Sequence, residues 1–246
     1  IRIGQLVGAS EVITGSLQLE GDTLVVHARG LALESGRISH DVIERGPIAD
    51  MFATFERAAR RFVPSTAASA RAAQPHPPLA VFENYIKGLL TETPATAIAY
   101  MNAALKALPQ FDRARLGLWE IFADQSDHAQ ALAAVLPVAE DSPWSRRATF
   151  LAGLSYLSLH RNDEAFAAFK SLAGAQPLGP GDQAGSLGPG DQAGSTAAAV
   201  NNIGIVQLRR GSTPQTGQAT YYFNKAAELD PNDVDYFFNL GYAYWQ

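Results

Sequence analysis

The pattern of apolar and polar residues changes along the chain. Between about residues 10 and 45, apolar and polar residues alternate, which is the period of a half-buried strand. Turn signals at Glu20-Gly21-Asp22 and at Ser35-Gly36 divide this region into three short runs. The alternation therefore predicts a three-stranded antiparallel sheet.

A helical period follows the predicted strands. Pro47 stands where the first turn of a helix tolerates proline, and apolar residues between 48 and 62 recur at helical spacing. From 63 to 78 the chain consists mainly of Pro, Ala, Ser and Gln, with almost no bulky apolar residue. We expect a helix that covers the sheet, followed by an interdomain linker over 63–78.

From residue 79 to the end, the apolar residues follow the period of paired helices, and the pairs repeat. Pro109, Pro143 and Pro177 are spaced 34 residues apart. A period of this length is that of one helix–turn–helix unit that ends in a proline-marked turn. Such a unit cannot bury its apolar face alone and must stack on its neighbours. We therefore predict a mostly α-helical solenoid over 79–246, with about four and a half repeats.

The most regular unit spans residues 146–177. Its characteristic residues are Gly153, Tyr156, Ala165, Phe169 and Pro177. These residue types at this spacing resemble the signature of the tetratricopeptide repeat (TPR) family. The resemblance implies an α-solenoid of helical hairpins whose function is to hold other proteins.

The neighbouring units keep the period with some departures. Residues 112–143 carry Trp119 where the family has a small residue, and residues 196–231 contain about three extra residues. A fifth unit stops at Gln246, before its second helix. Because the chain also opens on Ile1 rather than Met, we expect it to be a fragment of a longer protein.

The amino-terminal region resembles a second family. The segments 8–16, 21–24 and 35–38 read GASEVITGS, GDTL and SGRI, which is similar to the amino-terminal domain of TolB-type proteins. The resemblance covers residues 1–62 and implies a partial α/β domain whose first half lies upstream. Segments such as VNNIG at 200–204 resemble bacterial proteins that combine both parts, typically behind an export signal. This favours an extracytoplasmic (periplasmic or secreted) location, and a cytoplasmic location stays open.

One segment interrupts the repeats. Leu178–Ser186 is repeated without change as Leu187–Ser195, and removing these 18 residues nearly restores the 34-residue spacing. We predict a flexible insertion at 178–195. A phosphate-binding loop is the alternative, but the segment lacks a Gly-Lys-Ser/Thr ending and a preceding strand.

Composition narrows the classes of function. The net charge of −5 argues against a nucleic-acid-binding protein, which needs a basic surface. The absence of cysteine excludes disulfides, thiol catalysis and cysteine–zinc sites.

The sequence also lacks the patterns of a membrane helix and of a metal site. No apolar run reaches the roughly 20 residues of a membrane helix, and the five histidines lack a metal-binding spacing. The acidic turn at 230–235 resembles a calcium loop but lacks its glycine and its bidentate Glu. We expect no cofactor, no metal and no catalytic residue.

The TPR resemblance implies that first helices line a concave groove. We expect apolar and aromatic side chains there, with basic residues on the rim. The peptide-groove candidates are Arg113, Leu116, Arg147, Phe150, Leu154, Asn201, Ile205, Asn239 and Tyr242. Packing of some of these side chains against adjacent helices is the competing interpretation. Asn201 and Asn239 resemble asparagines that hold a peptide backbone in some such arrays.

These patterns together favour a protein–protein interaction scaffold that binds a peptide or protein partner in its groove. One alternative is a sensor or regulatory region of a larger bacterial signalling protein. The other is an enzyme that acts through the insertion and the acidic turn.

Overall fold

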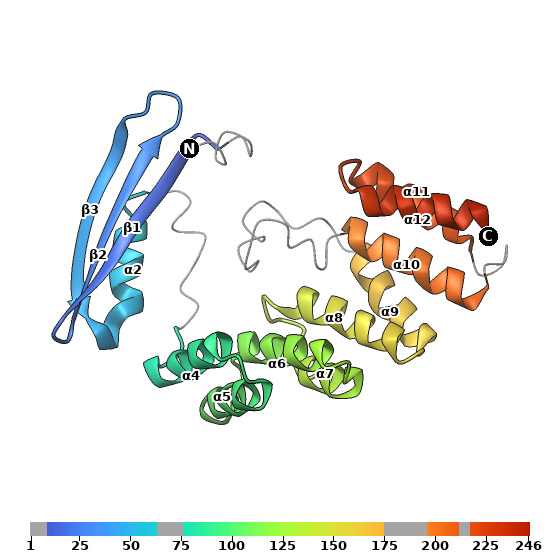
Figure 1. The fold of residues 1–246 in the computed structure, drawn as a ribbon, viewed down its shortest axis with the longest axis horizontal. Helices are drawn as coiled ribbons and strands as arrows, with labels where there is room; N and C mark the ends of the chain where they lie inside the picture. Colours follow the sequence, from blue (N-terminus) through green and yellow to red (C-terminus); the bar gives the residue numbers. More distant parts are fainter. Residues whose placement is uncertain (1–8, 63–75, 175–195, 212–216) are drawn as a thin grey trace. The chain divides into compact units, whose positions relative to one another are not determined.

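The computed structural model describes residues 9–62, 76–174, 196–211 and 217–246 (Figure 1). The chain divides into two compact units, residues 1–79 and 80–246. The predicted insertion at 178–195 and most of the predicted linker at 63–78 lie outside the described residues.

The first unit contains a three-stranded antiparallel sheet with the strand order β1-β2-β3 (Figure 1). The strands are β1 (Glu11–Glu20), β2 (Thr23–Ala32) and β3 (Ile38–Pro47). Gly21 and Gly36 lie between them with φ values of 61° and 65°, in the left-handed region that favours glycine. The three strands predicted from the alternating pattern are confirmed.

One helix covers part of this sheet. A single turn, η1 (Ile48–Asp50), leads into α2 (Met51–Ala59), which packs against β2 and β3. Leu24 and Val26 of β2 are buried together with Ala58 of α2, and Phe55 packs against them. The predicted covering helix is therefore confirmed, although α2 ends three residues before Phe62.

The rest of the described chain is helical. Its helices are α4 (Leu79–Leu90), α5 (Pro94–Ala107), α6 (Asp112–Asp124), α7 (His128–Val135), α8 (Ser145–Ser158), α9 (Asn162–Ala173), α10 (Thr196–Arg210), α11 (Ala219–Leu229) and α12 (Val234–Trp245). From α5 to α12, each helix packs on the next helix along the chain. This serial contact is the arrangement expected of stacked helical hairpins.

Two hairpins close where a glycine of the first helix meets an aromatic ring of the second. A Cβ built on Gly153 would lie 2.6 Å from ring carbons of Phe169. A Cβ on Gly204 would lie 2.6 Å from a ring carbon of Phe223. Side chains do not tolerate such distances, so only glycine allows these helices to approach so closely.

A Cβ on a third glycine, Gly88 of α4, would lie 2.9 Å from Met101 of α5. In all three cases the large residue that faces the glycine follows an alanine four positions earlier. Residues four apart lie on one face of a helix, so the pair presents a small and then a large side chain to the first helix. The three pairs are Ala97 and Met101, Ala165 and Phe169, and Ala219 and Phe223, all at most 4% exposed. Gly153 and Phe169, two residues of the TPR-like signature, thus meet between α8 and α9, with Ala165 buried one turn before Phe169.

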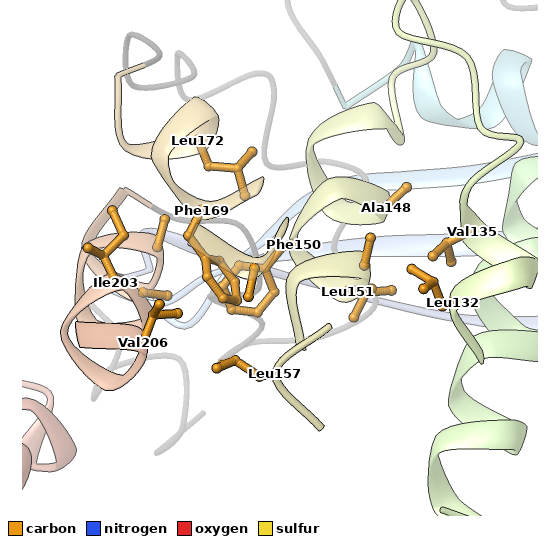
Figure 2. Packing of buried hydrophobic residues seen from close by; sticks show 14 of the residues in the cluster. Leu132, Val135, Ala148, Phe150, Leu151, Leu157, Phe169, Leu172, Ile203 and Val206 are labelled. Atoms are coloured by element: carbon orange, nitrogen blue, oxygen red, sulfur yellow. The ribbon is translucent and has the colours of Figure 1, made fainter. Parts of the chain in front are cut away.

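The largest apolar core runs through several hairpins (Figure 2). Its centre is an edge-to-face pair of rings, Phe150 of α8 and Phe169 of α9, with centroids 5.5 Å apart. Side chains of α7 and α10 complete the cluster: Leu132, Val135, Ile203 and Val206. Because one core is shared by successive hairpins, each hairpin depends on its neighbours for stability.

We expect opposite effects of an added methyl group at two glycines that occupy the same repeat position. Gly153→Ala should lower the free energy of unfolding by about 1–3 kcal/mol, because its Cβ collides with Phe169. Gly241→Ala should leave it unchanged or raise it by about 0.5–1 kcal/mol, because no atom lies within 4 Å and alanine favours helix. Urea unfolding followed by circular dichroism measures both. Equal destabilisation by the two substitutions would contradict the role given to the glycine–aromatic contact.

Candidate functional site

A shallow pocket lies between the first helices of three successive hairpins, α4, α6 and α8. Its lining residues are Tyr85, Leu89, Arg113, Leu116, Gly117, Glu120, Trp144 and Arg147. We call it the Arg113–Arg147 pocket. It brings together three of the predicted groove residues: Arg113, Leu116 and Arg147.

The repeat period places the two arginines. Arg113 and Arg147 are 34 residues apart, and each lies in the first turn of its helix, α6 or α8. Stacking of the two hairpins therefore points both guanidinium groups into the same pocket. Residues that repeat at the period of a solenoid form a row on one of its faces.

Arg113 is held by an aromatic ring rather than by a carboxylate. Its guanidinium carbon lies 5.1 Å from the ring centroid of Trp144, within the range of a cation–π contact. Among the described residues, no carboxylate lies within ion-pair distance of Arg113. The guanidinium is therefore oriented by Trp144 while its charge stays uncompensated at short range.

Arg147 has one acidic neighbour in the pocket. Its Nη2 atom lies 3.3 Å from Oε1 of Glu120. The Glu120 side chain is 47% exposed and that of Arg147 is 19% exposed. Among the residues that line the pocket, two arginines thus stand against one partly exposed carboxylate, so the lining carries a net positive charge.

Tyr85 forms an aromatic wall of the pocket. It is 3% exposed and packs edge-to-face on Phe111, with ring centroids 5.3 Å apart. Burial raises the pKa of its hydroxyl, and the charge of Glu120 acts in the same direction. The positive charges of Arg113 and Arg147 act against this rise in pKa. Tyr85 therefore presents a neutral hydroxyl beside the two cations.

The other groove candidates lie further along the array. Leu154 of α8 and Ile205 of α10 are partly buried against the largest core. Asn201 of α10 accepts a hydrogen bond of 3.0 Å from the amide of Asn239 on α12. Tyr242 is exposed, and its ring centroid lies 5.9 Å from that of Trp245. The two asparagines therefore join adjacent first helices.

Three candidates do not have the exposure expected of groove residues. Leu116 is 5% exposed, Phe150 is 6% exposed and Asn201 is 8% exposed. Phe150 is buried because its ring packs on Phe169 in the core. Leu116 belongs to the same core and forms part of the pocket wall. The expectation that these three side chains are exposed is wrong: Phe150 packs inside its own hairpin, whereas Leu116 and Asn201 contact neighbouring hairpins.

The two aromatic side chains of the pocket were not among the groove residues expected from the sequence. Tyr85 lies on α4, and Trp144 lies just before α8. The position of Trp144 directly after Pro143 and three residues before Arg147 is a usable signal. It places an aromatic ring at the start of the helix that carries the arginine.

Within the part of the chain that the structure describes, no three His, Asp or Glu side chains are grouped so that they could hold a metal ion. None of the described helices combines the length and the apolar character needed to span a membrane.

Comparison with known proteins identifies the fold. No protein-family model matches the sequence, and no curated protein sequence is significantly similar to it. A crystal structure of MamA protein aligns with a TM-score of 0.51 and 18% identity, covering 67% of this chain and 81% of MamA. A structure of PilF from Pseudomonas aeruginosa aligns with a TM-score of 0.50 and 18% identity, covering 68% of each chain. The likeness is one of fold: the helical part of this chain is a TPR-type α-solenoid of helical hairpins, preceded by a small α/β region.

The raised pKa of Tyr85 predicts a pH dependence of stability. Below about pH 10, the usual tyrosine pKa, the hydroxyl is neutral in the folded and in the unfolded chain, so it adds no pH dependence to the free energy of unfolding. Above it the unfolded chain releases this proton while the folded chain keeps it, so the free energy of unfolding falls until the folded pKa is passed. Tyr85→Phe should remove the part of this fall in the free energy of unfolding that is due to Tyr85.

Urea unfolding of wild type and variant between pH 8 and 11 measures the difference. The matched control is Tyr221→Phe, at an exposed tyrosine. Parallel alkaline curves for wild type and Tyr85→Phe would show that burial of Tyr85 does not shift its pKa.

Proposed function

We propose that the helical array is a non-catalytic scaffold that binds a peptide or protein partner along the face formed by its first helices. The observation that carries this proposal is the placement of Arg113 and Arg147, at equivalent repeat positions, in one pocket with two aromatic walls. A stacked array offers a continuous surface of this kind to an extended or helical ligand.

The pocket fits an acidic side chain of the partner. Arginine presents a planar fork of N–H donors that matches a carboxylate. Arg113 has no short-range carboxylate among the described residues, and Glu120, which pairs with Arg147, is 47% exposed. An incoming carboxylate would therefore gain charge-assisted contacts with the two guanidinium groups. The rings of Trp144 and Tyr85 would cover the aliphatic part of the same ligand residue.

The remainder of the proposed groove is apolar. Leu154, Ile205 and Tyr242 follow the pocket along the first helices α8, α10 and α12. Partly exposed apolar and aromatic side chains in a row are the usual anchors for the apolar residues of a bound peptide. We therefore propose a partner segment with an acidic residue near one end and apolar residues after it.

We also propose the domain organisation expected from the sequence. Residues 1–62 would be part of a TolB-like α/β domain, 63–78 a linker, and 79–246 the repeat array with its insertion. The order of three antiparallel strands followed by α2 supports the first assignment, and the division of the chain near residue 79 supports the second.

A charge-changing variant tests the proposed site. Peptides selected from a random display library on the 246-residue chain should be enriched in Asp or Glu. The double substitution Arg113→Gln/Arg147→Gln should weaken their binding by about tenfold or more, because each lost charge-assisted contact contributes roughly 1.5–3 kcal/mol. Isothermal titration calorimetry measures the affinity.

The matched control removes two positive charges from exposed second-helix positions. Lys170→Gln/Lys225→Gln alters the net charge by the same amount as the arginine variant, but on α9 and α11. It should leave the affinity for the selected peptides within about twofold of the wild-type value. Equal binding of the selected peptides to wild type and to Arg113→Gln/Arg147→Gln would contradict the proposed site.

A further inference from the structure

The Arg113–Arg147 pocket contains an acidic side chain that an acidic ligand residue does not use. Among the described residues that line the pocket, Glu120 is the one with a carboxylate. It follows Arg113 by seven residues on α6. Residues at this spacing lie on one face of a helix, two turns and about 10 Å apart along its axis. The pocket therefore has a positive end and a negative end on the same helix.

Glu120 makes one ion pair in the pocket and stays accessible. Its Oε1 atom lies 3.3 Å from Nη2 of Arg147, and its side chain is 47% exposed. An ionised carboxylate has two oxygens with about four acceptor positions. A donor from solution can therefore reach Glu120 while the contact with Arg147 is kept.

Binding of an acidic ligand residue brings two negative charges together at Arg147. The ligand carboxylate and Glu120 would both contact the same guanidinium group. Like charges at such short range repel each other, and the repulsion is stronger near a protein surface than in bulk water. A positive charge of the ligand beside Glu120 would offset this repulsion, whereas a second acidic residue there would increase it.

We propose that Glu120 makes the pocket specific for a pair of opposite charges in the partner, an acidic residue with a lysine or arginine close to it. The acidic residue contacts Arg113 and Arg147, and the basic residue pairs with Glu120. This inference rests on the function proposed for the pocket. It adds a second recognised charge and assigns Glu120 as a specificity-determining residue.

The geometry of the pocket also indicates the spacing of the two ligand charges. In an extended peptide, side chains on one face recur every second residue, at about 6.6–6.8 Å. The ligand carboxylate lies between the guanidinium groups of Arg113 and Arg147, so its distance to Glu120 is shorter than the two turns that separate Arg113 from Glu120. An acidic and a basic residue two positions apart fit this distance better than residues four positions apart.

Selection of peptides from the random display library on three forms of the 246-residue chain tests the proposal. Wild type should enrich peptides in which Lys or Arg stands two positions from the enriched Asp or Glu. Glu120→Gln should keep the enrichment of the acidic residue and lose that of the basic residue. Glu120→Arg should enrich a second acidic residue at the position of the basic one.

Calorimetry with a matched pair of peptides gives the size of the effect. One peptide is selected on wild type, and the other has its basic residue replaced by alanine. Both have an acetylated amino terminus and an amidated carboxyl terminus, so that only side chains carry charge. The replacement should weaken binding to wild type by about two- to fivefold, as expected for a partly exposed ion pair. It should not change the affinity for Glu120→Gln.

Glu164→Gln is the matched control. Glu164 is also a partly exposed glutamate that pairs with an arginine, at 2.7 Å from Nη2 of Arg161. It lies on α9, a second helix, and does not line the pocket. This variant should keep the two- to fivefold difference between the two peptides. Circular dichroism of all variants should show the helix content of wild type.

The outcomes separate this proposal from the function proposed for the pocket. Selection on wild type without enrichment of acidic residues would contradict both. Enrichment of acidic residues without a basic neighbour would overturn the role of Glu120 alone, and so would a basic neighbour that persists with Glu120→Gln. A preference for the basic residue that is lost with Glu120→Gln and kept with Glu164→Gln is the result that the proposal predicts.

Discussion

The helical part of this protein depends on a close contact between a glycine of one helix and a large side chain of the next. Gly153 with Phe169 and Gly204 with Phe223 leave no room for a single methyl group. This contact sets the distance within a hairpin, and the shared core between α7 and α10 sets the distance between hairpins. The positions of the first helices, and hence of the side chains on the face that they form together, follow from these two distances.

The same constraint explains how a chain with a net charge of −5 acquires a local basic pocket. Arg113 and Arg147 have equivalent positions in successive repeats, so the stacking distance alone brings them together. Trp144 then orients Arg113, and Glu120 holds Arg147 from the solvent side. The function proposed for the pocket is therefore a consequence of the repeat period, combined with two aromatic residues that are not part of that period.

Much of the fold was predictable because it rests on local patterns. The alternation before residue 45 predicted three strands, and the 34-residue spacing predicted stacked hairpins. Exposure was harder to predict. A helix position that faces the groove in a regular repeat, such as that of Phe150, turns into the core when a ring on the next helix is available to pack against it. The pocket wall formed by Tyr85 depends on three helices at once, and a linear pattern does not show such a contact.

The most direct test of the account asks which side of the array a bound peptide touches. A photo-crosslinking amino acid is placed at Leu89, at the edge of the Arg113–Arg147 pocket, and separately at the exposed Ala167 of second helix α9. Each protein is irradiated with a peptide selected for binding, and the crosslinked product is quantified by mass spectrometry. The account predicts a strong crosslink from position 89 and little from position 167. A crosslink from position 167 alone would show that the first-helix face is not the binding surface.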